Sequence, residues 1–325
     1  GLGVKLAPFA NLHDSVFIVS LCIIIFAFSI TYGLKYILSP TPSPDQPKRS
    51  WFKTYQSELG LILILFITTL PLLVKSYFYY DDWTLIGNPF FPCKENLIIL
   101  GRPFQVLFFT VLDRVNITNA YIFKWVYLFA LILYSLVLYR WLFHLSHNQK
   151  LAFFVSAILS LFAPAMDLLG YTALGVITYA LLFSTLSVVA FSRAYAAYQR
   201  REIWAGIPHT IISVLLLFTA CLTYQLGPQI IFLFLAIELF LSGNPRLTIR
   251  KHLAFLLVFA FSFGAYLLFI QALTQVNNFD LISDRSQIIH SIDQLVGKLN
   301  FYGQVFKQGV MQIGTALSGN AFVSE

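Results

Sequence analysis

The amino-acid sequence predicts an all-α membrane protein with about eight transmembrane helices. Hydrophobic residues make up 58% of the 325 residues and charged residues only 11%, whereas a soluble globular domain carries roughly 25% charged residues. The mean hydropathy is +0.76. The apolar residues are also gathered into runs near the length of about 20 residues that crosses a bilayer. These observations predict an integral, multi-pass membrane protein.

Eight apolar runs qualify as transmembrane helices, each bounded by polar or helix-breaking residues. They cover about 14–38, 58–79, 119–143, 151–165, 172–198, 203–223, 227–241 and 252–274. The first ends at the Pro-Ser run 39–44, which cannot continue a helix. The fourth is short, and Pro164 predicts that it stops below the membrane surface beside a protein-covered cavity. A further stretch, about 104–115, is too short to span and is expected to lie along the interface.

The chain is expected to have two parts. Residues 1–274 form the predicted transmembrane domain, in which 80–118 is a long loop with the candidate catalytic residues. Residues 275–325 are more polar and carry no full-length span. We expect them to form an extracytoplasmic segment. Whether further spans follow this segment stays open.

Basic residues predict which side of the membrane each connection faces, because Lys and Arg are enriched in cytoplasmic loops. Placing the loop with Lys48, Arg49 and Lys53 in the cytoplasm puts three further basic connections there too. Their basic residues are Arg140 and Lys150, Arg200 and Arg201, and Arg246, Arg250 and Lys251. The loop 80–118 then faces the other side, so its chemistry is expected at the extracytoplasmic surface.

Two adjacent carboxylates are the most prominent polar feature of that loop. They belong to the sequence YYDDW, residues 79–83, just past the second apolar run. The side chains of Asp81 and Asp82 diverge on an extended or turn backbone, so we expect separate roles rather than one shared proton. One could act as general base on a hydroxyl while the other holds a divalent cation or fixes the loop. Capping and solvation of a helix end explain them equally well.

Trp83 and three cations are candidate binding residues on the same side of the membrane as these carboxylates. Trp83 could stack against a sugar or belong to the interfacial aromatic belt. Arg102, in the tetrad GRPF (101–104), could hold an anionic phosphate. Lys94 and Arg285 are expected on the same side. For the arginines, a surface cation that snorkels beside the interface is the alternative interpretation.

Other polar residues near span ends are also candidates. Tyr224 and Gln225 lie at the mouth between the sixth and seventh spans, where Gln225 could bond a sugar hydroxyl or simply form a polar turn. Asp167 could be a second carboxylate for an acceptor or a metal, or a solvated loop residue. Glu238 lies inside the seventh span, where a charge costs at least ~2.5 kcal/mol. It is therefore expected either to approach the cytoplasmic interface, most simply by snorkelling, or to have a partner. His252 is expected to be isolated, without a zinc motif.

Several function classes are excluded or disfavoured. The net charge of +7 is spread over short loops, with no basic stripe, so no nucleic-acid partner is expected. The three cysteines lie far apart, and no metal-thiolate site or disulfide framework follows. A transporter or lipid flippase is disfavoured because the sequence has no internal repeat and no paired, Gly-interrupted helices with buried charge.

Five short motifs together resemble a known enzyme family. They are YYDDW (79–83), GRPF (101–104), DRV (113–115), FAPAMDLLGY (162–171) and LTYQ (222–225). This pattern, over about 59–290, is similar to the type II glucosyltransferases of phage serotype conversion and their bacterial relatives, which belong to the GT-C class of polytopic glycosyltransferases.

The resemblance implies a GT-C-like fold and an inverting sugar transfer at the outer face of the cytoplasmic (inner) membrane. The donor would be a polyprenyl-phosphate-linked sugar, held with its tail among membrane lipid, and the acceptor a glycan or lipid of the cell envelope. The family's catalytic base maps to Asp81 or Asp82, and its GR position near the donor phosphate maps to Arg102.

The chain departs from the family at both ends. It has an extra helix before Lys48, and it has a polar segment after the eighth span where family members carry further spans. A non-catalytic structural or assembly subunit, bound to membrane-protein partners in a larger complex, therefore stays open as an alternative.

Overall fold

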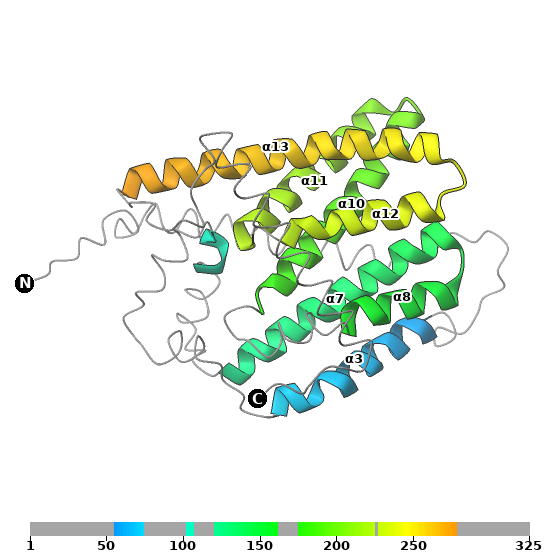
Figure 1. The fold of residues 1–325 in the computed structure, drawn as a ribbon, viewed down its shortest axis with the longest axis vertical. Helices are drawn as coiled ribbons and strands as arrows, with labels where there is room; N and C mark the ends of the chain where they lie inside the picture. Colours follow the sequence, from blue (N-terminus) through cyan, green and yellow to red (C-terminus); the bar gives the residue numbers. More distant parts are fainter. Residues whose placement is uncertain (1–54, 75–101, 107–119, 162–174, 225–226, 278–325) are drawn as a thin grey trace, which may run out of the picture. The chain divides into compact units, whose positions relative to one another are not determined.

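The computed structural model describes residues 55–74, 102–106, 120–161, 175–224 and 227–277. Their regular structure is helical throughout, without a strand in these ranges (Figure 1). The elements are α3 (Gln56–Val74), α7 (Ala120–Ser146), α8 (Gln149–Leu161), α10 (Ile177–Gln199), α11 (Ile203–Thr223), the 3-10 helix η1 (Gly227–Gln229), α12 (Ile230–Leu241) and α13 (Pro245–Asn277). One further helical turn covers 103–106. The prediction of an all-α protein is confirmed for this part of the chain.

Four of the described helices contain segments long and apolar enough to cross a bilayer. These candidate spans are Lys124–Ser146, Ile177–Gln199, Ile203–Thr223 and Pro245–Ala272. Three shorter apolar helices cover Gln56–Pro71, Gln149–Leu161 and Gly227–Leu241. The chain is therefore a membrane protein. The predicted first span, 14–38, lies outside the described residues, and the total of eight spans stays a prediction.

Helix ends agree with the sequence where local signals set them. The sixth predicted span, 203–223, has the same bounds as α11. The predicted fourth span, 151–165, corresponds to α8, Gln149–Leu161, and its predicted end near Pro164 lies outside the described residues. Asn148 caps its start by accepting a hydrogen bond of 3.1 Å from the amide of Leu151. Of the predicted interfacial helix 104–115, only the turn to Val106 lies within the described residues.

The start of the last helix is a correction to the prediction. The sequence suggested a basic loop before a span at 252, but α13 already begins at Pro245. Asn244 caps this helix, because its Oδ1 accepts a hydrogen bond of 3.3 Å from the amide of Leu247. Proline at the first helical position costs no hydrogen bond. Arg246, Arg250 and Lys251 are therefore helical residues.

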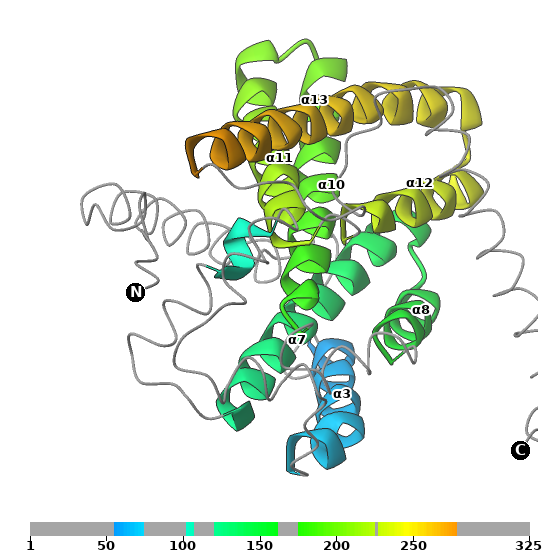
Figure 2. The ribbon, with the colours of Figure 1, turned by 60° about the vertical axis from the view of Figure 1, so that its left-hand side comes forward.

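The central helices of the bundle are α7 and α10. In the candidate spans of α10 and α7, 83% and 78% of the residues are buried, against 22% in α13. The most extensive contact joins α10 to α11, while α3 packs on α7 and α8, and α13 packs on α11 (Figures 1 and 2). The outer helix α13 therefore exposes much of its apolar surface.

Small and hydroxylated side chains allow these helices to approach closely. Between α10 and α11, Ser187 Oγ donates to the carbonyl of Ser213 at 2.9 Å and Ser213 Oγ donates to the carbonyl of Ser187 at 3.1 Å. Between α7 and α8, the hydroxyls of Ser135 and Ser160 are 2.5 Å apart. The buried residues of α8 are all small, namely Ala152, Ser156, Ala157 and Ser160.

Candidate functional site

Because successive helices alternate in direction, their connections gather at two ends of the bundle. One end, called the basic end, carries the α7–α8, α10–α11 and α12–α13 turns. The other, called the Arg102 end, carries the turn 102–106, the starts of α7 and α10, the end of α11, and η1. At this second end the hydroxyl of Tyr179 donates to the carbonyl of Val126 at 2.9 Å, which joins the start of α10 to the start of α7.

Arg102 and Tyr224, two predicted site residues from distant segments, contact each other at this end. The guanidinium carbon of Arg102 lies 4.3 Å from the centroid of the Tyr224 ring. A cation over an aromatic face at this distance is attracted by the electron-rich ring. The motifs GRPF and LTYQ therefore meet in the fold, a contact that no sequence pattern predicts.

The backbone on both sides of this contact is fixed. The carbonyl of Arg102 accepts hydrogen bonds from the amides of Gln105 and Val106, at 3.1 and 3.3 Å. Tyr224 is the C-cap of α11 and is extended. Its amide donates to Ala220 at 2.9 Å, and its carbonyl accepts from Gly227 at 2.9 Å. Two short turns thus hold the arginine and the tyrosine in place.

Phe104 anchors the arginine turn on α10. Its side chain is buried and packs edge-on against Phe183, with ring centroids 6.1 Å apart. Phe183 in turn contacts Tyr179, at 6.3 Å between centroids. The tetrad GRPF thus supplies a cation and, two residues later, the aromatic side chain that fixes its position on the central helix.

This arrangement suits the recognition of an oxyanion. A guanidinium offers several N–H donors in a planar fork, which matches phosphate or carboxylate oxygens. An aromatic face beneath it restricts its orientation. The Arg102–Tyr224 pair can therefore position a phosphate group at one end of the bundle.

Lys124 is a second cation at the Arg102 end that was not predicted as a site residue. It is the first residue of a candidate span and is only 1% exposed. Lysine is almost never so deeply buried unless its charge is paired. The signal in the sequence was a charge inside the predicted span 119–143, because charged residues are rare within transmembrane segments.

The remaining predicted site residues lie outside the described residues. They are Asp81, Asp82, Trp83, Lys94, Asp167, Gln225 and Arg285. Their roles stay predictions. Among the described residues, no group of three or more His, Cys, Asp or Glu side chains could hold a metal ion. A divalent cation at Asp81 and Asp82 therefore also stays a prediction.

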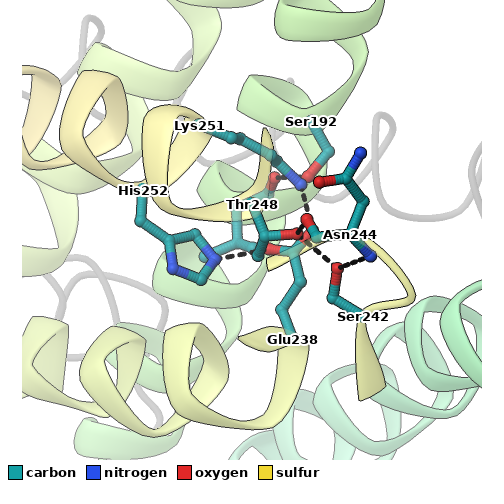
Figure 3. A network of polar contacts seen from close by, with 8 residues as sticks. Ser192, Glu238, Ser242, Asn244, Thr248, Lys251 and His252 are labelled. Carbon is teal, nitrogen blue, oxygen red and sulfur yellow. Dashed lines mark hydrogen bonds and ion pairs between the residues drawn. The ribbon is translucent and has the colours of Figure 1, made fainter. Parts of the chain in front are cut away.

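At the basic end, Glu238 has partners, which is the second of the two alternatives that its place inside the span predicts, and it does not snorkel. Its side chain is only 9% exposed, and its Oε1 accepts a hydrogen bond from the ammonium of Lys251 (Figure 3). Its Oε2 lies 3.2 Å from Nε2 of His252, which was expected to be isolated. The sequence did not identify these partners, because α13 starts earlier than expected, which places Lys251 and His252 on a helical face beside α12.

A second buried ion pair joins α3 to α7 at the same end. Nη2 of Arg140 lies 2.8 Å from Oε1 of Glu58, and both side chains are at least nine-tenths buried. Arg140 was assigned to a cytoplasmic turn but lies inside α7, with its guanidinium 5.6 Å from the centroid of the Tyr55 ring. Gln149 of α8 donates to Ser57 of α3 at 2.6 Å. These contacts connect three helices.

Comparison of the chain with protein-family models, with curated proteins and with solved structures finds no match. The resemblance to GT-C glycosyltransferases therefore rests on the sequence motifs alone. Two of those motifs supply the described pair, Arg102 and Tyr224.

Proposed function

We propose that this chain is a membrane glycosyltransferase of the GT-C type. It transfers a sugar from a polyprenyl-phosphate-linked donor to a glycan or lipid acceptor of the cell envelope. The observation that carries the proposal is the contact between Arg102 and Tyr224, at 4.3 Å from guanidinium carbon to ring centroid. Two motifs of the family resemblance meet there, and they form a suitable site for the donor phosphate.

In the proposed reaction, Arg102 binds the phosphate that links the sugar to the polyprenyl chain. Asp81 or Asp82 removes the proton from the acceptor hydroxyl, whose oxygen attacks the anomeric carbon from the face opposite the phosphate. The bond from the anomeric carbon to the phosphate oxygen breaks, and its electron pair leaves with the polyprenyl phosphate. The guanidinium stabilises the charge on this leaving group. The product has inverted anomeric configuration.

The proposal places the reaction at the extracytoplasmic side of the cytoplasmic membrane. The basic end carries the Arg and Lys residues of three turns, and the positive-inside rule assigns such an end to the cytoplasm. The Arg102 end then faces outward. The polyprenyl tail of the donor would lie in the hydrocarbon beside the apolar helices.

The proposal can be tested by transfer of a labelled sugar. Membranes with the full-length chain are incubated with polyprenyl-phosphate-linked radiolabelled glucose, and then with the galactose and mannose donors, and label in envelope glycans and lipids is counted. We expect transfer above that of membranes without the chain. Arg102→Gln should lower the rate roughly 100-fold, because it removes the charge that stabilises the leaving phosphate.

The matched control is Arg200→Gln, the same substitution at the exposed α10–α11 turn, which should leave transfer unchanged. Asp81→Asn and Asp82→Asn identify the base, since one of the two should abolish transfer. No transfer from any of the three donors, or full transfer by Arg102→Gln and both Asn variants, would contradict the proposal.

A non-catalytic subunit of a membrane complex is the second candidate. It is favoured by α13, whose exposed apolar face includes Leu257 and Leu268, 73% and 69% exposed. A neighbouring membrane protein could cover this face as well as lipid could. Co-purification with fixed partners, together with no sugar transfer, would favour this function over the enzyme.

A further inference from the structure

The α12–α13 turn presents an exposed cationic surface at the basic end. Arg246 and Arg250 lie four residues apart on α13, so they share one side of the helix, and both are exposed. Phe240, on the last turn of α12, is 89% exposed. Leu247 and Ile249 are also exposed. Arginines mixed with exposed apolar side chains are typical of a surface at the boundary between headgroups and acyl chains.

The acidic residue of this helix pair is withdrawn from the surface. Glu238 is buried and bound by Lys251 and His252, so its charge is neutralised within the protein (Figure 3). Lys251 is used in the same contact. Among the described residues of this turn, the charges left at the surface are those of Arg246 and Arg250.

The α10–α11 turn provides a comparison within the same chain. It also carries two exposed arginines, Arg200 and Arg201, but the next residue is the exposed Glu202. An acid beside two bases lowers the positive potential of that turn. The two turns thus have equal numbers of exposed arginines and different net charge at the surface.

The α12–α13 turn is also held in one conformation. The hydroxyls of Ser242 and Thr248 are 2.5 Å apart, and the amide of Asn244 donates to Ser242 Oγ at 3.1 Å (Figure 3). Asn244 caps α13 as well. A fixed turn loses little conformational entropy when it binds a ligand.

We propose that the α12–α13 turn binds the headgroup of an anionic phospholipid. Arg246 and Arg250 both contact the oxygens of the lipid phosphate, and Phe240 lies against the acyl chain. Basic side chains at a membrane surface attract anionic lipid, and two of them act together here. This inference does not depend on the glycosyltransferase proposal, because the Arg102 end takes no part in it.

The experiment is native mass spectrometry of the full-length chain in detergent, titrated with phosphatidylglycerol or with zwitterionic phosphatidylcholine of the same acyl chains. We expect the wild-type chain to retain phosphatidylglycerol preferentially. Arg246→Gln with Arg250→Gln should weaken phosphatidylglycerol binding by roughly 20- to 30-fold, from about fivefold for each arginine at the surface.

Two further variants separate this site from a general charge effect. Arg246→Lys with Arg250→Lys keeps the charge and should retain most of the binding. Arg200→Gln with Arg201→Gln removes the same charge from the other turn and should weaken binding less than threefold. Equal retention of both lipids, unchanged binding in the first double variant, or equal loss in both glutamine double variants would overturn the proposal. Each variant must first show the same thermal unfolding temperature as the wild-type chain, so that a loss of lipid binding does not come from unfolding.

Discussion

The two ends of the bundle use charge in different ways. The described acidic residues are Glu58, Glu202 and Glu238, and all three lie at the basic end. The two that are buried there are bound by Arg140 and by Lys251 with His252. At the Arg102 end, the described charged side chains are Arg102 and Lys124, both positive. Charge at the basic end joins helices, whereas at the Arg102 end the guanidinium of Arg102 lies over the ring of Tyr224, where we propose that it binds the donor phosphate.

This difference shows why burial alone does not identify a site. Glu238 and Lys124 are both charged residues buried near the end of a helix. The carboxylate of Glu238 is bound by Lys251 and His252 of the neighbouring helix, so its role is structural. Because the removal of one partner from a buried ion pair leaves a desolvated charge, substitutions at the basic end should affect stability most. Substitutions of the Arg102–Tyr224 pair should instead affect sugar transfer.

The largest expected effect on stability is that of Glu238→Gln. It leaves the part-buried Lys251 ammonium without a carboxylate and should lower the free energy of unfolding by about 3–5 kcal/mol. Thermal unfolding in detergent, followed by circular dichroism, measures the change. Glu202→Gln is the control, because Glu202 is exposed and should shift stability by less than about 0.5 kcal/mol. Equal shifts for the two variants would remove the distinction between surface and buried acids.

A double-mutant cycle at Glu58 and Arg140 sharpens the same comparison. Glu58→Gln and Arg140→Met should each destabilise the chain by about 3 kcal/mol, because each leaves one buried charge. The double variant leaves none and should be more stable than the sum of the single changes, by about 1–3 kcal/mol. Urea unfolding of the four proteins in mixed micelles gives the coupling. Additive effects would mean that the 2.8 Å contact does not hold α3 to α7.

The smallest of these effects is expected at Tyr224. Tyr224→Leu removes the aromatic face under Arg102 and should lower sugar transfer about tenfold, with less than about 1 kcal/mol of lost stability. Tyr224→Phe keeps the ring and should retain most of the activity. If the leucine variant instead unfolded like Glu238→Gln while keeping its rate, the Arg102 end would be as structural as the basic end.

Sequence patterns predicted the helices better than they predicted the contacts between helices. The bounds of α11 follow from an apolar run with polar residues on both sides, which is local information. The start of α13 was missed because basic residues in its first turns read as a loop, although Asn244 and Pro245 form a helix start. The partners of Glu238 depend on how α12 packs on α13, and no local pattern contains that.

The candidate site was likewise predictable only as separate residues. Arg102 and Tyr224 were each singled out from their motifs, but their contact exists only because η1 and the turn 102–106 both pack against α10. Lys124 was overlooked because one lysine barely changes the hydropathy of a long apolar run. A charge within a span carries more information than the average of the residues around it.

The reciprocal bonds between Ser187 and Ser213 bear on how the chain is made. Each hydroxyl donates to a carbonyl of the neighbouring helix, so α10 and α11 satisfy these polar atoms within the pair. Arg200, Arg201 and Glu202 keep the short connection between them in water. The translocation machinery can therefore release these two helices into the bilayer together as a hairpin. The later helix α13 then packs on a hairpin whose polar atoms between the two helices are already hydrogen-bonded.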